Sequence, residues 1–155
     1  MGIEIERKFL VLHDSWRASV GASTRFRQGY LSGSGTASVR VRTDSQAGWI
    51  NIKSVVLCVQ RQEFEYEIPL ADAEQMLNTL ALKPLIEKTR HYVAFGSHTW
   101  EIDEFEAENA GLIVAELELD DADEAFERPA WIGAEVTDDA RYYNTNLAKK
   151  PFTTW

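Results

Sequence analysis

Apolar and polar residues alternate in steps of two along much of this chain. The pattern recurs in several segments, at residues 3–9, 39–42, 50–53, 63–68, 88–91, 100–103 and 115–119. An alternation of period two is typical of β-strands whose two faces differ in polarity. Together with the segment around residues 26–31, the sequence predicts about eight strands.

Helical spacing of apolar residues is confined to a few short segments. Residues 71–82 give the clearest amphipathic pattern, with acidic residues in the first turn. Residues 14–20 predict a short helix that is capped by Asp14 or Ser15. Residues 144–150 predict another helix near the end of the chain.

The arrangement of these elements indicates a single, mainly β domain. Short links between neighbouring strands favour antiparallel pairing, and about eight short strands are typical of a sandwich or a barrel. A length of 155 residues fits one domain with its own core. We therefore expect one domain over residues 1–155, mainly β with a few helices.

Composition and charge exclude several classes of partner. The formal net charge is −9, which argues against nucleic-acid binding because that function requires a basic face. The sequence has no apolar run long enough to cross a bilayer, so we expect no membrane partner. Cys58 is the single cysteine, which rules out an internal disulfide and favours a reducing, cytoplasmic environment.

The alternation alone does not decide which face of the strands meets water. Charged residues normally face solvent while the apolar face forms the core. The signs of the charges, however, are sorted by strand. Arg40 with Arg42 and Lys88 with Arg90 are basic pairs, and the acidic sets are Glu63-x-Glu65-x-Glu67, Glu101-x-Asp103 and Glu116-x-Glu118. A simple solvated face usually mixes signs, because like charges on one face repel.

Sorted charges of this kind suit a metal-assisted reaction on a phosphate chain. Carboxylates at positions i and i+2 lie about 7 Å apart on one strand face and can share a hard cation. Basic pairs opposite that cation would bind phosphate oxygens. An interior that holds so many ions must be wet, because burying an unpaired ion costs several kcal/mol.

An ordered set of motifs resembles the triphosphate tunnel metalloenzymes, also called CYTH domains. The set begins with Glu4-Ile5-Glu6-Arg7-Lys8, which is similar to the Glu-x-Glu-x-Lys signature of that family. The other matching motifs follow in order: Gln28-Gly29-Tyr30-Leu31, Arg40-Val41-Arg42, Ile52-Lys53-Ser54, Arg61-Gln62-Glu63-Phe64-Glu65-Tyr66, Lys88-Thr89-Arg90, Trp100-Glu101-Ile102-Asp103-Glu104-Phe105, Ala115-Glu116-Leu117-Glu118-Leu119 and Val136-Thr137-Asp138 through Arg141-Tyr142-Tyr143-Asn144.

The resemblance implies a closed eight-stranded antiparallel β-barrel, a tunnel lined by charged residues, with a few helices packed outside. It implies a hydrolase that uses one or two Mg²⁺ or Mn²⁺ ions and converts inorganic tripolyphosphate to pyrophosphate and phosphate. The expected partner is this small triphosphate, and a homodimer is left open.

The resemblance also assigns roles to individual residues. The expected substrate-binding residues are Lys8, Arg40, Arg42, Lys53, Arg61, Lys88 and Arg90. The expected metal ligands are Glu4, Glu6, Glu63, Asp103, Glu116 and Glu118. Glu6, Lys8, Lys53 and Arg42 are expected to act in catalysis. In this scheme Glu4, Glu116 and Glu118 hold one metal, and Glu6 holds or orients a second metal or its water, with Asp103 or Glu63 as its partner.

Four other functions stay open at this point. A class IV adenylate cyclase would share the fold but would also have to seat adenine and ribose, and the sequence offers no aromatic set to assign to that role. A thiamine triphosphatase would need an aromatic side chain at the tunnel mouth to stack on a base, for which Trp49 or Tyr30 could serve. A polyphosphate or nucleotide sensor would bind without turnover. A β-barrel interaction module would make the charged faces ordinary surface.

Two departures from the family pattern affect these expectations. Residues 55–59 are apolar where the family usually has a polar turn, so this loop is expected to be packed or to form a subunit contact. Asn51 stands where Thr is common. Neither departure removes a charged residue of the expected site.

Overall fold

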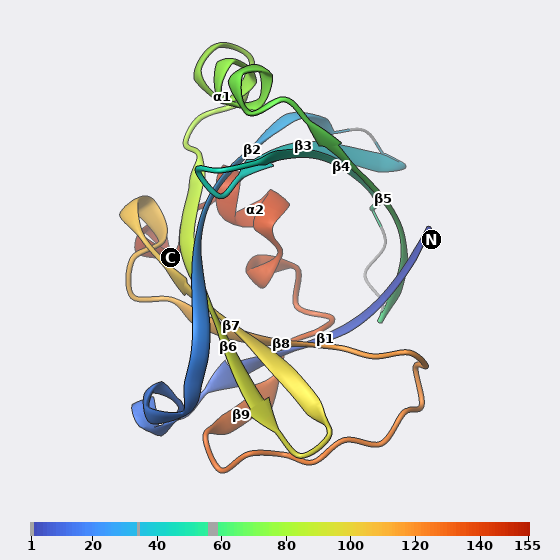
Figure 1. Cartoon of the computed structure of the whole chain (residues 1–155), viewed down its shortest axis with the longest axis vertical. Coiled ribbons are helices and arrows are strands. Elements are labelled where there is room, and N and C mark those ends of the chain that lie inside the picture. Colours follow the sequence, from blue (N-terminus) through green and yellow to red (C-terminus); the bar gives the residue numbers. More distant parts are fainter. Residues whose placement is uncertain (1, 34, 56–58) are drawn as a thin grey trace.

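The computed structural model describes residues 2–33, 35–55 and 59–155 and consists mainly of one antiparallel sheet (Figure 1). The strands are β1 (Ile3–Val11), β2 (Val20–Gly33), β3 (Ala37–Thr43), β4 (Gly48–Ser54), β5 (Gln60–Ile68), β6 (Ile86–Phe95), β7 (His98–Phe105), β8 (Ile113–Glu118) and β9 (Ile132–Glu135). The helices are α1 (Leu70–Thr79) and α2 (Asn144–Lys149), with 3₁₀ turns η1 (Asp14–Ser19), η2 (Ala107–Asn109), η3 (Ala140–Tyr142) and η4 (Phe152–Thr154).

Eight of these strands close into a ring. Their order is β5-β4-β3-β2-β6-β7-β8-β1, and pairing between β1 and β5 joins the two ends. Strand β1 makes both joins because its first residues pair with β5, whereas Glu6 to Leu10 pair with β8. The short strand β9 adds to the later part of β1 outside this ring. The predicted eight-stranded antiparallel architecture is confirmed.

The largest apolar core lies on the outer side of the ring. Phe9, Trp100 and Leu117 project outward from β1, β7 and β8, where they are fully buried. Trp16 of η1 and Trp131, which precedes β9, pack against them. The chain between β8 and β9 and the 3₁₀ turn before β2 therefore cover this part of the sheet from outside (Figure 1).

The two α-helices lie at different places on the ring. Helix α1 packs outside, with Ala73 and Leu77 buried against Val41 of β3. Helix α2 buries Leu147 against a cluster that includes Ile86 and Val114. Those two residues precede Lys88 and Glu116 by two positions, so they share the inner face of their strands. Helix α2 therefore covers one end of the ring from inside its outline (Figure 1).

Most predicted elements are present, with some differences at their ends. The segment predicted at residues 14–20 contains a 3₁₀ turn over Asp14–Ser19. Its N-cap is His13, whose side chain accepts from the Ser15 backbone N–H, so the predicted cap by Asp14 or Ser15 is wrong. Strand β9 was not predicted. Residues 56–58, the middle of the apolar loop, lie outside the described residues. In the part of the chain that the structure describes, the helices are too short to cross a membrane.

Candidate active site in the charged tunnel

The inner face of the ring encloses a cavity of about 1160 Å³. The charged lining that the strands supply comes from β1, β3, β4, β5, β6, β7 and β8, and consists of Glu4, Glu6, Lys8, Arg40, Arg42, Lys53, Arg61, Glu63, Glu65, Arg90, Glu101, Glu116 and Glu118. Of the residues expected in the site, only Lys88 and Asp103 do not line the cavity. The charged faces of the strands thus point inward, and the structure brings most of the predicted residues together.

At the join between β1 and β8, carboxylates from both strands lie close to the Lys8 ammonium. Glu6 pairs in register with Glu118, and Lys8 pairs with Glu116. The Lys8 ammonium donates to Glu116 at 2.6 Å and lies 3.3 Å from the Glu6 carboxylate. Lys8 is buried, so these two carboxylates stabilise a charge that water cannot reach.

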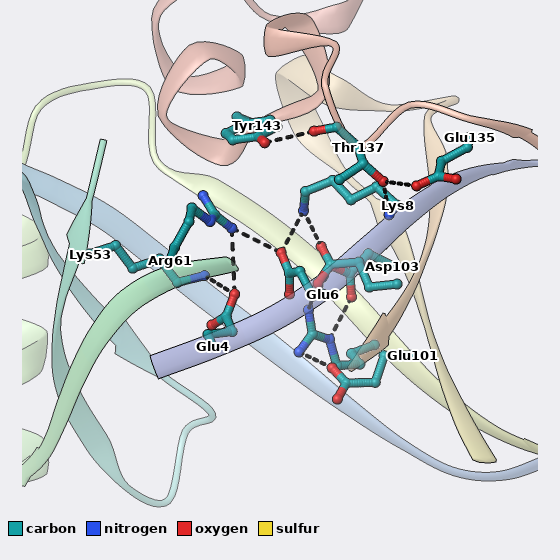
Figure 2. Close-up of polar contacts among 12 residues, drawn as sticks. Glu4, Glu6, Lys8, Lys53, Arg61, Glu101, Asp103, Glu135, Thr137 and Tyr143 are labelled. Carbon is teal, nitrogen blue, oxygen red and sulfur yellow. Dashed lines mark hydrogen bonds and ion pairs between the residues drawn. The ribbon is translucent and has the colours of Figure 1, made fainter. Parts of the chain in front are cut away.

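A second group of ion pairs links β1 with β4 and β5 (Figure 2). The Lys53 ammonium donates to Glu4 at 2.9 Å. The Arg61 guanidinium bridges both carboxylates of β1, at 3.0 Å from Glu6 and 3.4 Å from Glu4. Because Lys53 and Arg61 come from neighbouring strands, closure of the ring between β1 and β5 creates this cluster.

The environment pushes the pKa values of these carboxyl groups in opposite directions. Burial opposes the ionisation of Glu4, but Lys53 and Arg61 together outweigh it and lower the pKa of Glu4. Burial and the nearby Glu116 carboxylate raise the pKa of Glu6 to about 7. Burial and the Glu4 carboxylate also raise the pKa of Glu118. At the join between β1 and β8, burial and neighbouring carboxylates thus raise the pKa values of Glu6 and Glu118, whereas Lys8 and Arg90 outweigh burial and lower the pKa of Glu116.

Lys88 and Asp103 form a layer behind the cavity wall. Lys88 donates to one oxygen of Asp103 at 2.6 Å, and Arg90 binds the same carboxylate through two nitrogens at 2.7 and 2.9 Å. Asp103 is fully buried, so both of its oxygens are engaged by cations and not turned to the cavity. Burial lowers the pKa of Lys88 to about 8. This arrangement aims Arg90 into the tunnel, where it also meets Glu101 and Glu116.

Arg42 of β3 is held between two aromatic rings. Its guanidinium lies 4.5 Å from the ring centre of Phe26 and 5.5 Å from that of Trp49. Burial and the neighbouring Arg40 lower the pKa of Arg42 to about 10. An anion with several oxygens is the ligand that such closely spaced cations favour.

Several residues of the C-terminal part reach the site, although they are not among the residues expected in it. The Tyr143 ring lies 4.9 Å from the Arg61 guanidinium and 5.7 Å from the Lys8 ammonium. Its hydroxyl donates to the Thr137 carbonyl, and the Thr137 hydroxyl accepts from the Lys8 backbone N–H (Figure 2). Asn144 and Lys149 of α2 also line the cavity. The family motif that contains Thr137 and Tyr142-Tyr143-Asn144 was the signal in the sequence that could have placed these residues in the site.

The donor set suits a hard divalent cation. Glu4, Glu6, Glu116 and Glu118 supply carboxylate oxygens, the ligands that Mg²⁺ and Mn²⁺ prefer. Burial raises the pKa values of Glu6 and Glu118, nearby carboxylates raise them further, and a bound cation would offset both effects. Across residues 2–33, 35–55 and 59–155, no three His, Cys, Asp or Glu side chains are gathered to hold a metal as they stand. Binding would therefore require carboxylates to turn from their Lys and Arg partners.

Comparison with known proteins places the fold and the site in a family. The model of the CYTH domain matches residues 2–150. The chain belongs to the CYTH family. This CYTH chain is 45% identical over 152 residues to a protein of Acetivibrio thermocellus named inorganic triphosphatase, covering 98% of the chain and 97% of that protein. It is 34% identical over 149 residues to the inorganic triphosphatase of Nitrosomonas europaea, covering 94% and 96%.

Solved structures of the CYTH fold agree with the ring seen here. The crystal structure of the inorganic triphosphatase NE1496 is 32% identical and aligns with a TM-score of 0.66, over 94% of this chain and 93% of that one. The PH1012 protein of Pyrococcus horikoshii aligns with a TM-score of 0.60 over 77% of this chain and 80% of that one. At 18% identity, the second similarity extends to the fold alone.

Proposed function

We propose that this protein hydrolyses inorganic tripolyphosphate to pyrophosphate and phosphate with the help of a divalent metal ion. The observation that carries the proposal is the shared cavity, in which the carboxylates of β1 and β8 face the cations of β3, β4 and β6. Two relatives that cover nearly the whole chain bear the name inorganic triphosphatase, which supports the same reaction.

The cations of the cavity would bind the phosphate chain. In this structure Lys8, Lys53 and Arg61 pair with carboxylates, and their positive charges lie along the cavity wall. Arg40, Arg42 and Arg90 would add contacts, and a guanidinium can bind two phosphate oxygens at once. Lys88 lies behind the cavity wall. We therefore propose that it affects substrate binding indirectly, by holding Asp103 in place and, through Asp103, Arg90.

Glu4, Glu116 and Glu118 would hold Mg²⁺ or Mn²⁺ at the join between β1 and β8. When bound there, such an ion supplies positive charge that stabilises the phosphate oxygens in the transition state. Asp103 is less suited to this role because Lys88 and Arg90 occupy its oxygens. Glu63 of β5 lines the cavity, and it would be a ligand of a second metal ion.

The chain's own residues would then direct the reaction. Glu6 would orient the attacking water, whose oxygen forms a bond to the terminal phosphorus while its proton passes to solvent or to a phosphate oxygen. The bridging P–O bond breaks, and its electron pair leaves on pyrophosphate. Lys8, Lys53 and Arg42 would stabilise the charge that develops on the bridging oxygen and on the transferred group.

Assembly and location are further parts of the proposal. Phe64 and Tyr66 project from the outer face of β5 and are 44% and 60% exposed. Exposed apolar side chains that share one sheet face suit packing against another protein. We propose a homodimer that uses this face, in the cytoplasm, and light scattering of the purified protein checks the dimer by its mass.

The decisive experiment measures phosphate release from tripolyphosphate, ATP and thiamine triphosphate, each with Mg²⁺, with Mn²⁺ and with a chelator. We expect tripolyphosphate to be hydrolysed fastest, in a metal-dependent reaction. Cyclic AMP formed from ATP would favour the cyclase, and preference for thiamine triphosphate would favour that hydrolase. Tight binding of tripolyphosphate with no turnover under any metal would favour the sensor.

A further inference from the structure

Asn51 is a buried polar residue behind the cavity wall. It lies in the middle of β4 and is 1% exposed. It shares the inner face with Lys53, because residues two apart on a strand point to the same side. The cavity is lined by Glu63 and Glu65 of the next strand, whereas Asn51 does not line it. The reaction proposed above gives this amide no part.

The side-chain amide of Asn51 donates to two different carboxylates. Its Nδ2 atom lies 2.5 Å from Oε1 of Glu63 and 3.2 Å from Oε2 of Glu65. These carboxylates stand at positions i and i+2 of β5, where like charges repel. An amide has two N–H donors and no charge, so Asn51 holds both carboxylates in place without neutralising them.

Glu65 in turn contacts Arg42 across the inner face. Their side chains are joined at 3.4 Å, from Nη2 of Arg42 to Oε2 of Glu65. Within the described residues, the Nε atom of Arg42 is buried and has no hydrogen-bond partner. The rings of Phe26 and Trp49 restrict the guanidinium, but a flat ring does not fix the direction of its N–H groups. The contact with Glu65 therefore sets that direction.

Glu63 also has a competing partner. It pairs in register with Lys53, the residue whose ammonium binds Glu4 at 2.9 Å. A carboxylate directly across from an ammonium is well placed to attract it. The hydrogen bond from Asn51 to Glu63 therefore keeps Lys53 available for Glu4 and for the cavity.

We propose that Asn51 is a positioning residue for the substrate. It fixes Glu65, which aims the Arg42 guanidinium at the phosphate chain, and it restrains Glu63 from drawing Lys53 away. The inference rests on the proposed function, since it concerns how the same tunnel binds tripolyphosphate. Asn51 touches neither the substrate nor a metal in this scheme, so its effect falls on binding of the phosphate chain.

The residue type at this position follows from the geometry. A Thr side chain offers one hydroxyl donor, so it could serve only one of the two carboxylates at a time. An Asp side chain would have the same shape as Asn but would add a third negative charge beside Glu63 and Glu65. The three substitutions therefore form a graded series. Asn51→Thr keeps one contact, Asn51→Ala keeps none, and Asn51→Asp makes repulsive ones.

The test measures kcat and KM for tripolyphosphate, together with the melting temperature, for each variant. We expect Asn51→Ala to raise KM on the order of tenfold with a smaller change in kcat, as loss of a supporting hydrogen bond often does. Asn51→Thr should recover part of the loss, and Asn51→Asp should be the worst of the three. The control is Gln62→Ala, which removes an outward-facing amide from β5 and should leave KM unchanged.

A double-mutant cycle with Glu65→Gln tests the proposed route. If Asn51 acts through Glu65, the two changes in KM will be less than additive, whereas independent sites add. Additive changes, or a wild-type KM in folded Asn51→Ala, would overturn the positioning role. A lower melting temperature with unchanged KM in all variants would also overturn it. A wild-type protein that leaves tripolyphosphate intact would instead refute the proposed function itself.

Discussion

The two faces of the same strands differ in polarity around the charged cavity. On β7, Trp100 and Ile102 point outward into the apolar core, while Glu101 and Asp103 point inward among Arg90 and Lys88. Stability is concentrated on the outer face, where packing excludes water. Charge is concentrated on the inner face, where each buried ion depends on a partner of opposite sign. In this fold the candidate site lies inside the ring, and the largest apolar core lies outside it.

The largest effect on stability is expected from the outer face. Trp100 is fully buried, with its ring 5.4 Å from Phe9 and 5.7 Å from Trp131. The substitution Trp100→Ala should lower the free energy of unfolding by about 3–5 kcal/mol, because it leaves a large cavity. Denaturant unfolding measures this loss. The KM for tripolyphosphate of the folded variant should stay that of the wild type, and a raised KM would contradict the separation of the faces.

A change on the inner face should lower the activity strongly and the stability little. Arg42→Ala removes a guanidinium that lines the cavity, and we expect kcat/KM for tripolyphosphate to fall by about 10² to 10³. The free energy of unfolding should change little, because burial and Arg40 already disfavour the Arg42 charge. Arg42→Lys serves as the control, and it should restore only part of the activity since an ammonium cannot bind two oxygens in a plane. Full activity in Arg42→Ala would exclude it from the site.

A smaller effect is expected where the C-terminal part joins the ring. Tyr143→Phe removes the hydroxyl that donates to the Thr137 carbonyl but keeps the ring over Arg61 and Lys8. The free energy of unfolding should fall by about 1 kcal/mol, the usual net value of one hydrogen bond. Thermal unfolding checks the stability, and steady-state kinetics should show an unchanged KM. A large rise in KM would instead assign the hydroxyl to substrate binding.

The smallest effect is expected at the surface. Arg141 pairs with Asp139 at 2.7 Å, and its side chain is 64% exposed. Arg141→Ala should change neither the melting temperature nor the kinetics measurably, because exposed ion pairs contribute little. A clear loss of activity would instead assign Arg141 to substrate binding.

Much of this architecture was predictable from the sequence, and the parts that were not have identifiable causes. Alternation identified β1 as a strand, and the ordered motifs, not the alternation, placed Glu4, Glu6 and Lys8 on the inside. Strand β9 was missed because it has only four residues and is defined by its pairing with β1. Its local sequence carries too little periodicity to reveal it.

The sequence also could not predict how deep a residue lies within the tunnel. Lys88 and Arg90 alternate identically on β6, but Arg90 lines the cavity and Lys88 lies behind its wall. Their places depend on how the neighbouring strands pair with β6, which a residue pattern does not contain. The sequence likewise gave Asn51 only as a departure from the family, and its two carboxylate partners appear once β4 pairs with β5.

One paired measurement tests the difference between the faces most directly. Glu116 faces the tunnel from β8, whereas Glu104 of β7 faces outward and pairs with Arg17 at 2.9 Å. Glu116→Gln and Glu104→Gln remove the same charge, so the rate of Mg²⁺-dependent hydrolysis of tripolyphosphate compares the two faces alone. We predict that Glu116→Gln loses nearly all of this activity while Glu104→Gln keeps it. Equal activities in the two folded variants would contradict a catalytic site inside the ring.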